Sequence, residues 1–232
     1  MTRFFRALLA GLFFVCYGAF ALPFALLLLL PIWPSRTVRF LVRLFYRLFV
    51  FFAHMTRLYR VRVDEETLRS LKFCRGRIVV ANHVSLIDIC ILFAFLPDST
   101  ALAKAQARRN PFLGMVVKKM LIANDENPEV TIERVRGFLA KGVNVVVFPQ
   151  GTRGGTSLRR GAARFALATG ATIAVFRLDY DPVVLAKGQP WWDMGAREIV
   201  IDLKSRGEIV PQGGSSHAAA IALTNLIGEK IK

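Results

Sequence analysis

His83 and Asp88 are the pair of residues in this sequence best suited to acid–base catalysis. They belong to the stretch 82–88, which reads N-H-V-S-L-I-D and follows a short apolar run that predicts a buried strand. A carboxylate about one helical turn beyond a histidine can accept the proton of one ring nitrogen, so that the other nitrogen is left to take a proton from a substrate. The only other histidines are His54, in an arginine-rich aromatic segment, and His217, after a Gly-Gly-Ser-Ser loop. His83 is therefore the candidate general base.

This spacing by itself is weak evidence. A histidine at the end of a strand can simply cap a turn, and an aspartate in the first turn of a helix is favoured by the helix dipole. Short motifs of this kind also arise often by chance. A structural role and a catalytic role carry about equal weight until a second motif is taken into account.

The second motif lies at residues 148–155, which read F-P-Q-G-T-R-G-G and follow another β-branched run. Backbone amides freed by glycine, a hydroxyl and a guanidinium at the end of a strand can bind an anion, and here Gly151, Thr152 and Arg153 supply them. A glycine-rich surface turn with one solvated arginine is the alternative. Because ligands gather beyond the carboxyl ends of strands in layered α/β folds, we expect both motifs to meet in one pocket.

The two motifs, in this order, resemble those of the PlsC-type glycerolipid acyltransferases (1-acylglycerol-3-phosphate acyltransferase-like enzymes). That family has an N-H-x4-D block followed by an F-P-E-G-T-R block. The resemblance extends from about Gly76 to about Pro211 and includes Lys104 and the stretch Asn110–Gly114. It implies an acyltransferase that uses an acyl thioester, carried by coenzyme A or acyl carrier protein, as a substrate and needs no cofactor.

The resemblance also assigns roles to individual residues. It implies that His83 is the general base and that Asp88 orients it. It also implies that the later block binds the phosphate of the acceptor. The substrate-binding candidates are Gly151, Thr152, Arg153, Gln150 and Lys104.

Three positions depart from the family pattern. Gln150 replaces the usual glutamate of the second block and keeps its hydrogen bonding without the charge, and Asn124 stands where the family usually has a phosphate-binding arginine. Ala174 replaces a proline on a later strand. These changes leave the base intact, but they favour considering a specialised lipid acceptor beside lysophosphatidate.

The order of elements predicts an α/β fold, with a layered, mostly parallel sheet flanked by helices. Apolar runs alternate with helical patterns after Val63, and Ser215 or Ser216 would cap a last helix that ends at Ile231. The predicted strands are Gly76–Asn82, Thr100–Lys104, Met120–Ala123, Val143–Phe148, Ala171–Leu178 and Glu198–Leu203, and the predicted helices are Leu86–Phe95, Pro111–Lys119, Pro128–Ala140 and Gly161–Thr169.

The first 63 residues differ from the rest and are predicted to anchor the protein to a membrane, while residues 64–232 form the catalytic domain. Residues 7–33 are almost wholly apolar and long enough to cross a bilayer, although Pro23 also allows a re-entrant hairpin. Residues 36–62 carry a basic stripe on an apolar, aromatic helix, the pattern of a helix in the membrane interface. A buried helix of a larger assembly would show the same pattern. The arginine excess that follows the apolar run favours the inner membrane with a cytoplasmic catalytic domain.

Composition argues against other partners. The net charge is +16, but no acid occurs among residues 1–62, so the excess is concentrated beside the apolar run rather than in a nucleic-acid-binding module. The three cysteines form no C-x-x-C pair and no metal-like spacing with histidine, so we expect neither a disulfide nor a metal site.

The sequence therefore predicts a membrane-bound O-acyltransferase that moves a fatty acyl group to the hydroxyl of a lysophosphatidate-like lipid, with membrane lipids and a lysophospholipid acceptor as partners. A catalytically silent membrane-binding protein is the alternative from another class. A lipid hydrolase is disfavoured because the sequence has no G-x-S-x-G elbow. Ser85, two residues from the base, is better explained as a helix-start residue than as a nucleophile.

Overall fold

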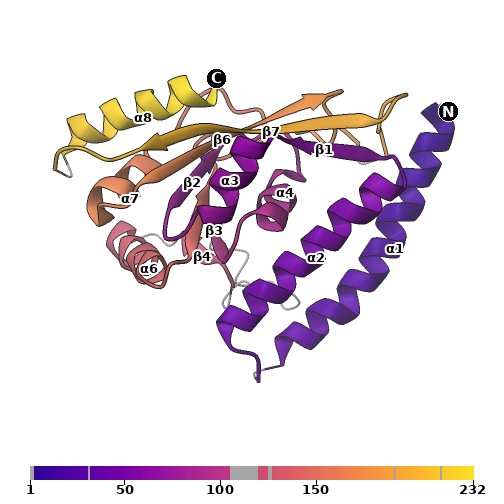
Figure 1. Cartoon of the computed structure of the whole chain (residues 1–232), viewed down its shortest axis with the longest axis horizontal. Coiled ribbons are helices and arrows are strands. Elements are labelled where there is room, and N and C mark those ends of the chain that lie inside the picture. The colour runs from indigo at the N-terminus through magenta and orange to yellow at the C-terminus, as the bar shows by residue number, and fades with distance from the viewer. Residues whose placement is uncertain (1–2, 31, 105–119, 125–126, 191, 215) are drawn as a thin grey trace.

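The computed structural model describes residues 3–30, 32–104, 120–124, 127–190, 192–214 and 216–232 (Figure 1). Within these residues, a seven-stranded sheet has the order β1-β7-β6-β2-β5-β3-β4. Every neighbouring pair is parallel except β6 and β7, which are antiparallel. The predicted α/β fold with a mostly parallel sheet is confirmed. The strands are β1 (Tyr59–Val63), β2 (Ile78–Ala81), β3 (Ser99–Lys104), β4 (Ile122–Asn124), β5 (Asn144–Val147), β6 (Ile173–Asp181) and β7 (Ile199–Ile209).

Helices cover both faces of the sheet (Figure 1). Both faces of strand β2 are buried. Val79 and Ala81 belong to the core under α2 and α4, whereas Ile78 and Val80 belong to the core under α7 and α8. Side chains alternate between the two faces of a strand, so a sheet covered on both faces needs an uninterrupted apolar run. The helices are α1 (Arg3–Leu29), α2 (Ser35–Met55), α3 (Glu65–Phe73), α4 (Asp88–Phe95), α6 (Pro128–Ala140), α7 (Gly161–Thr169) and α8 (His217–Ile231).

The predicted elements of the catalytic part that fall within the described residues are present with shifts in their ends, the largest at β7, which was expected to end at Leu203 and continues to Ile209. The predicted N-cap at Ser216 is observed, because its hydroxyl accepts a hydrogen bond from the amide of Ala219 at 3.1 Å. The short helix α3 was not predicted; it begins after Asp64, whose carboxylate accepts the amide of Thr67 at 2.7 Å. The predicted helix Pro111–Lys119 lies outside the described residues.

The N-terminal region differs from the prediction at its end. Residues 36–62 were expected to form one helix, but α2 ends at Met55 and the chain then enters strand β1. Because β1 pairs with β7, the sheet begins about five residues before the predicted domain boundary at residues 63/64. The tyrosine, valine and arginine residues of β1 suit an edge strand.

Helices α1 and α2 form an antiparallel hairpin whose connection lies away from the sheet (Figure 1). The hydroxyl of Tyr17 donates to the carbonyl of Phe45 at 2.6 Å, and their rings lie 4.6 Å apart. At the other end of the hairpin, the guanidinium of Arg6 donates to the carbonyl of Leu58 at 3.0 Å. The N-terminus of α1 and the C-terminus of α2 therefore both lie beside the sheet.

Two arginines of the predicted basic stripe on α2 contact the catalytic part. Arg39 is buried and forms a two-pronged ion pair with Asp98, and Arg43 donates to the carbonyl of Phe95 at 3.3 Å. The stripe was interpreted as facing a membrane surface, but these two side chains face the catalytic part. Their partners are Asp98, which follows α4, and the carbonyl of Phe95, which ends α4. The periodicity of α2 is thus explained in part by packing within the protein.

Candidate active site

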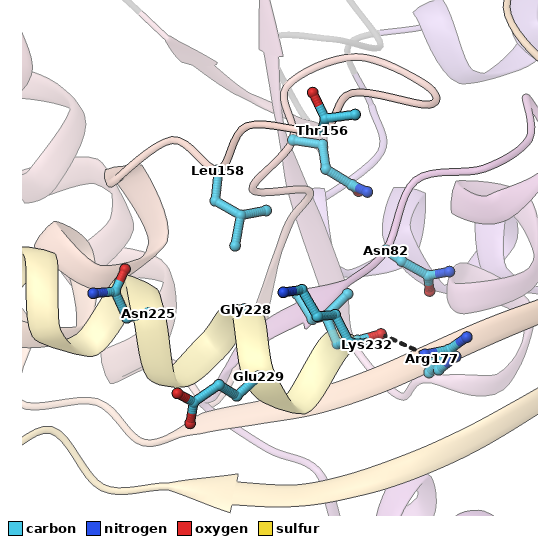
Figure 2. A pocket seen from close by; sticks show the side chains of 10 residues that line it. Asn82, Thr156, Leu158, Arg177, Asn225, Gly228, Glu229 and Lys232 are labelled. Carbon is cyan, nitrogen blue, oxygen red and sulfur yellow. Dashed lines mark hydrogen bonds between the residues drawn. The ribbon is translucent and has the colours of Figure 1, made fainter.

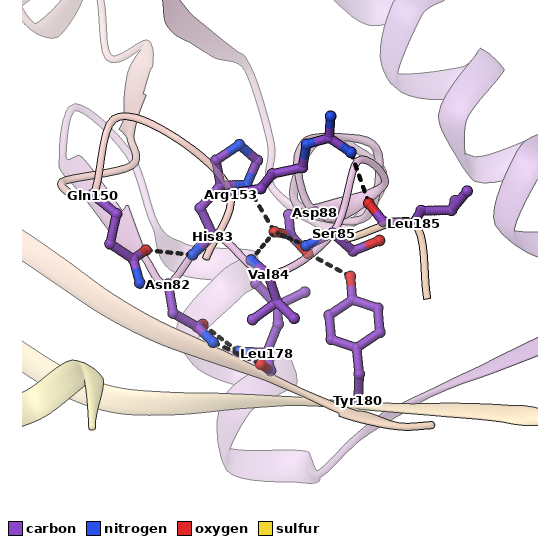
Figure 3. Close-up of polar contacts among 10 residues, drawn as sticks. All are labelled: Asn82, His83, Val84, Ser85, Asp88, Gln150, Arg153, Leu178, Tyr180 and Leu185. Atoms are coloured by element: carbon purple, nitrogen blue, oxygen red, sulfur yellow. Dashed lines mark hydrogen bonds and ion pairs between the residues drawn. The ribbon is translucent and has the colours of Figure 1, made fainter. Parts of the chain in front are cut away.

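The candidate site is built around a hydrogen bond between His83 and Asp88. Strand β2 ends at Ala81, and α4 begins at Asp88, so the turn between them brings both side chains together at the carboxyl edge of the sheet. The Nδ1 atom of His83 lies 2.8 Å from Oδ2 of Asp88 (Figure 3). Since an ionised carboxylate only accepts hydrogen bonds, Nδ1 carries the proton and Nε2 is left with its lone pair. This is the arrangement of a general base.

The carboxylate of Asp88 is held on both oxygens. The backbone amides of Val84 and Ser85 donate to Oδ2 at 2.7 and 2.9 Å, and the hydroxyl of Tyr180 donates to Oδ1 (Figure 3). Asp88 is fully buried and is the first residue of α4, where the helix dipole favours a negative charge. A buried charge is tolerated when it is hydrogen-bonded in this way.

The ring of His83 is fixed from its other side. It stacks on the ring of Phe148 with centroids 4.3 Å apart and an angle of 17° between the planes. The carbonyl of His83 accepts the amide of Gly154 at 2.8 Å. Phe148 and Gly154 both come from the second motif, so the two predicted motifs meet, as expected.

Gln150 links the two motifs directly. Its side-chain oxygen Oε1 accepts the backbone amide of His83 at 2.6 Å (Figure 3). A glutamate could accept the same hydrogen bond, so the change from the family pattern keeps this contact while removing a charge. Asn82, the residue before the histidine, exchanges two hydrogen bonds of 2.7 Å with the backbone of Leu178 on β6. These contacts fix the backbone on each side of His83.

Gly151 of the second motif is needed for the backbone of the turn. Gly151 has a φ of +68°, and a Cβ there would lie 2.7 Å from Nε of Arg159. Its amide donates to the carbonyl of Phe148 at 3.0 Å. That amide is therefore engaged within the turn, in contrast to the expectation that it faces an anion, while Thr152 is exposed. Gly151 shapes the loop because other residues rarely adopt this φ.

Arg153 lies at the site and contacts a distant segment. Its Nη1 donates to the carbonyl of Leu185 at 2.7 Å, and the same carbonyl accepts the amide of Leu86 at 3.2 Å (Figure 3). Leu185 is buried and has a φ of +54°, a conformation that its side chain disfavours. The segment after β6 therefore positions Arg153, whose guanidinium has five N–H donors in total.

Other sequence candidates are only partly placed. Lys104 ends β3, which lies next to β5 in the sheet. Asn124 ends the edge strand β4 and is the residue paired with Lys104 in the register of the two strands. Ala174 lies buried in β6. The stretch Asn110–Gly114 falls outside the described residues.

Two residues of the site were missed from the sequence. Phe148 was recognised as part of a motif but not as the stacking partner of His83, and Tyr180 was not singled out at all. Tyr180 shares one face of β6 with Phe176 and Leu178, as the two-residue period of a strand requires. The period could have grouped them, but nothing in the sequence shows that this face meets α4.

A cavity of about 660 Å³ adjoins the site between the second motif and α8 (Figure 2). Asn82 and Gln150 line it on the side of the motifs, and Arg177 and Glu229 line it elsewhere. Arg177 is already engaged, because it donates to the carbonyl of Ile231 at 3.2 Å and to the carboxylate of Asp179 at 2.7 Å. Within the described residues, no group of three His, Cys, Asp or Glu side chains is arranged to hold a metal ion.

The turn after β2 thus holds a buried aspartate against a histidine, and it meets a glycine turn that carries an arginine; these groups together are suited to acid–base chemistry on an anionic substrate. The family model described as Acyltransferase matches residues 60–179, which is just over half of the 232 residues. The chain belongs to the acyltransferase family. Its sheet and both motifs fall largely within the matched region.

Individual relatives agree with this family. The chain is 28% identical over 141 residues to a 1-acyl-sn-glycerol-3-phosphate acyltransferase from Cocos nucifera, covering 54% of this chain and 42% of that protein. It is 32% identical over 130 residues to a lyso-ornithine lipid O-acyltransferase from Pseudomonas aeruginosa, covering 53% and 48%. The matches thus span somewhat less than half the length of each curated relative.

The fold is also that of a solved structure. The crystal structure of the 1-acyl-sn-glycerophosphate (LPA) acyltransferase PlsC from Thermotoga maritima matches with a TM-score of 0.71 and 22% identity. The match covers 98% of this chain and 94% of that chain. The two chains share one fold along nearly their whole length, including the region of the N-terminal hairpin.

Proposed function

We propose that this protein is a membrane-bound O-acyltransferase that transfers a fatty acyl group from an acyl thioester to the hydroxyl of a lysophosphatidate-like glycerolipid. The observation that carries the proposal is the 2.8 Å hydrogen bond between His83 and the fully buried Asp88. It leaves Nε2 of a partly exposed imidazole as a base. Family membership and the acyltransferases among the relatives give the reaction class.

The reaction needs a base, an acceptor site and a proton for the leaving group. Nε2 of His83 takes the hydroxyl proton as the acceptor oxygen attacks the thioester carbonyl. The C–O bond forms and the C–S bond breaks, and the imidazolium returns the proton to the departing thiolate. Asp88 stabilises the imidazolium throughout. The products are an acylated lipid and a free thiol, and no covalent acyl-enzyme is required.

The acceptor is an anionic lysolipid in the leading proposal, held by Arg153 with Thr152 beside it. Arg153 is held by its hydrogen bond to Leu185 and lies in the loop that follows Phe148, the stacking partner of His83. A different lipid acceptor is the second candidate, and Gln150 is the observation that favours it. Its uncharged side chain binds the His83 amide, and one relative is a lyso-ornithine lipid O-acyltransferase.

The membrane attachment in this proposal is the α1–α2 hairpin. Among the described helices, one, Arg3–Leu28, is long and apolar enough to cross a bilayer, and large apolar side chains along α1 are exposed. Because both open ends of the hairpin lie beside the sheet, insertion as a re-entrant hairpin agrees better with the geometry than a single crossing. Such insertion seats the site at the bilayer surface, on the cytoplasmic side of the inner membrane, where acyl chains reach it without crossing water.

The test is a matrix of donors and acceptors with purified protein in liposomes. Acyl-CoA and acyl-carrier-protein are each paired with lysophosphatidate, lyso-ornithine lipid and no acceptor, and both thiol release and lipid products are measured. Acceptor-dependent thiol release with a newly acylated lipid is expected. Thiol or fatty-acid release that needs no acceptor would instead indicate a hydrolase, and no release from any pair would favour the silent membrane-binding protein.

A further inference from the structure

Tyr180 reaches the His83–Asp88 pair from the strand next to β2, on the face of the sheet that α4 covers. It lies in β6, and its hydroxyl donates to Oδ1 of Asp88, the oxygen that does not face the histidine (Figure 3). The other oxygen, Oδ2, accepts Nδ1 of His83 and two backbone amides. The three side chains therefore form a chain of hydrogen bonds, Tyr180–Asp88–His83, of which the sequence motif contains only the last two members.

We propose that Tyr180 is a positioning residue that sets how strongly Asp88 holds His83, and thereby the pH range in which His83 acts as a base. This inference rests on the proposed function. A hydrogen bond donated to Oδ1 draws negative charge toward the tyrosine and away from Oδ2. It also fixes the rotation of the carboxylate, so that Oδ2 stays aimed at Nδ1.

Tyr180 is suited to this role because it remains a donor. Burial, together with the adjacent charge of Asp88, raises the pKa of its phenol well above the usual value, so the hydroxyl stays protonated at any working pH. Cys90 also lies close to Asp88, but burial raises the pKa of this thiol to about 12 and it stays neutral. Among the described side chains drawn around the pair in Figure 3, Arg153 is the other charged one, and its guanidinium donates to the carbonyl of Leu185.

Removing the hydroxyl has a defined consequence. In Tyr180→Phe, Oδ1 remains buried without this donor, and more of the negative charge lies on Oδ2. The imidazolium of His83 is then held more tightly, so the histidine is neutral and able to act as a base only at higher pH. The acidic limb of the pH–rate profile should move up by about half to one pH unit. The maximal kcat should fall by roughly 3- to 30-fold as the carboxylate loses its fixed rotation, with KM little changed.

The matched control is Tyr59→Phe. The hydroxyl of Tyr59 is also buried but has no hydrogen-bond partner among the described residues. Removing the Tyr59 hydroxyl should leave the acidic limb of the pH–rate profile and kcat as they are in the wild type. A role for Tyr180 in packing alone predicts that both phenylalanine variants keep the wild-type limb.

A second substitution acts in the opposite direction and preserves the shape of the side chain. Site-specific replacement of Tyr180 by 3,5-difluorotyrosine makes the phenol a stronger donor, so the acidic limb should move to lower pH. Opposite movements for phenylalanine and difluorotyrosine would support the proposal. A limb that stays in place in both would overturn it, and if Tyr180→Phe does not fold, the direction seen with difluorotyrosine decides.

A readout without turnover separates this inference from the proposed function. Diethylpyrocarbonate modifies histidine only in its neutral form, and subtracting the modification of His83→Ala removes the contribution of His54, His217 and other nucleophilic side chains. The pH of half-maximal His83 modification should shift in the same directions as the limb. If the wild type transfers no acyl group, the proposed function fails, whereas the modification profile still tests the hydrogen-bond chain.

Discussion

The side chains of His83 and Asp88 are joined by a 2.8 Å hydrogen bond between atoms of very different exposure. The aspartate is fully buried, whereas a fifth of the histidine side chain is exposed. The charge that orients the ring is thus protected from water while the ring itself faces the surface. This asymmetry suits the proposed general base, because its free nitrogen has to meet a substrate.

Asp88→Asn should abolish most activity. The amide can present its NH₂ group to Nδ1, which would favour the tautomer with the proton on Nε2 and remove the base. We expect kcat to fall by roughly 10²- to 10⁴-fold with little change in KM for the acceptor. Circular dichroism should show a folded protein, and activity within a few-fold of wild type would contradict the assigned role.

The protein should stay active when Gln150 is replaced by a residue that keeps the acceptor oxygen. Gln150→Ala leaves the amide of His83 without its 2.6 Å partner and should lower kcat by roughly tenfold or more. Gln150→Glu retains the acceptor and should keep most of the activity. Equal losses in both variants would show that the contact to His83 is not what makes this residue important.

Arg153 should affect the acceptor more than the chemistry. Arg153→Gln removes a charged donor next to the site, so the KM for lysophosphatidate should rise by roughly tenfold, with a smaller change in kcat. Monoacylglycerol, which lacks the phosphate, is the control acceptor and should be little affected. If both acceptors lose kcat/KM equally, Arg153 supports the fold through Leu185 rather than binding an anion.

The hairpin prediction concerns the exposed face of α1. Leu8 and Leu12 are each 60% exposed, so Leu8→Asp with Leu12→Asp should leave folding intact. Burying two leucine side chains in a bilayer is worth about 3 kcal/mol or more, so the double variant should bind liposomes at least roughly tenfold more weakly in flotation. Val130→Asp on α6, across the sheet, is the control and should float like the wild type.

The sequence predicts the catalytic pair but not its whole environment. His83 and Asp88 are close in the chain, and the turn between a strand and a helix brings them together by local geometry alone. The partners of this pair come from elsewhere: Gln150 and Phe148 follow β5, and Tyr180 lies on β6. These contacts depend on which strands are neighbours, and strand order cannot be obtained from periodicity.

The N-terminal region shows a second limit of the sequence. The sequence of α2 fits a basic stripe on a membrane surface as well as it fits packing within the protein. Packing is what the structure shows for Arg39 and Arg43, because Asp98 and the carbonyl of Phe95 are their partners. Strand β1 was missed because its alternation of valine and arginine continues the basic, apolar composition of the helix before it. In both cases the deciding partner is distant in sequence.

The role of His83 as the base is tested most directly by the rate of acyl transfer by His83→Ala, measured with the donor and acceptor that the wild type uses. His54→Ala and His217→Ala are matched controls, because both of those histidines are exposed and lie outside the two motifs. We expect kcat for His83→Ala to fall by roughly 10²-fold or more, while both controls stay near wild type and the wild type and all three variants bind liposomes alike. Substantial transfer by His83→Ala would contradict the assignment of His83 as the base.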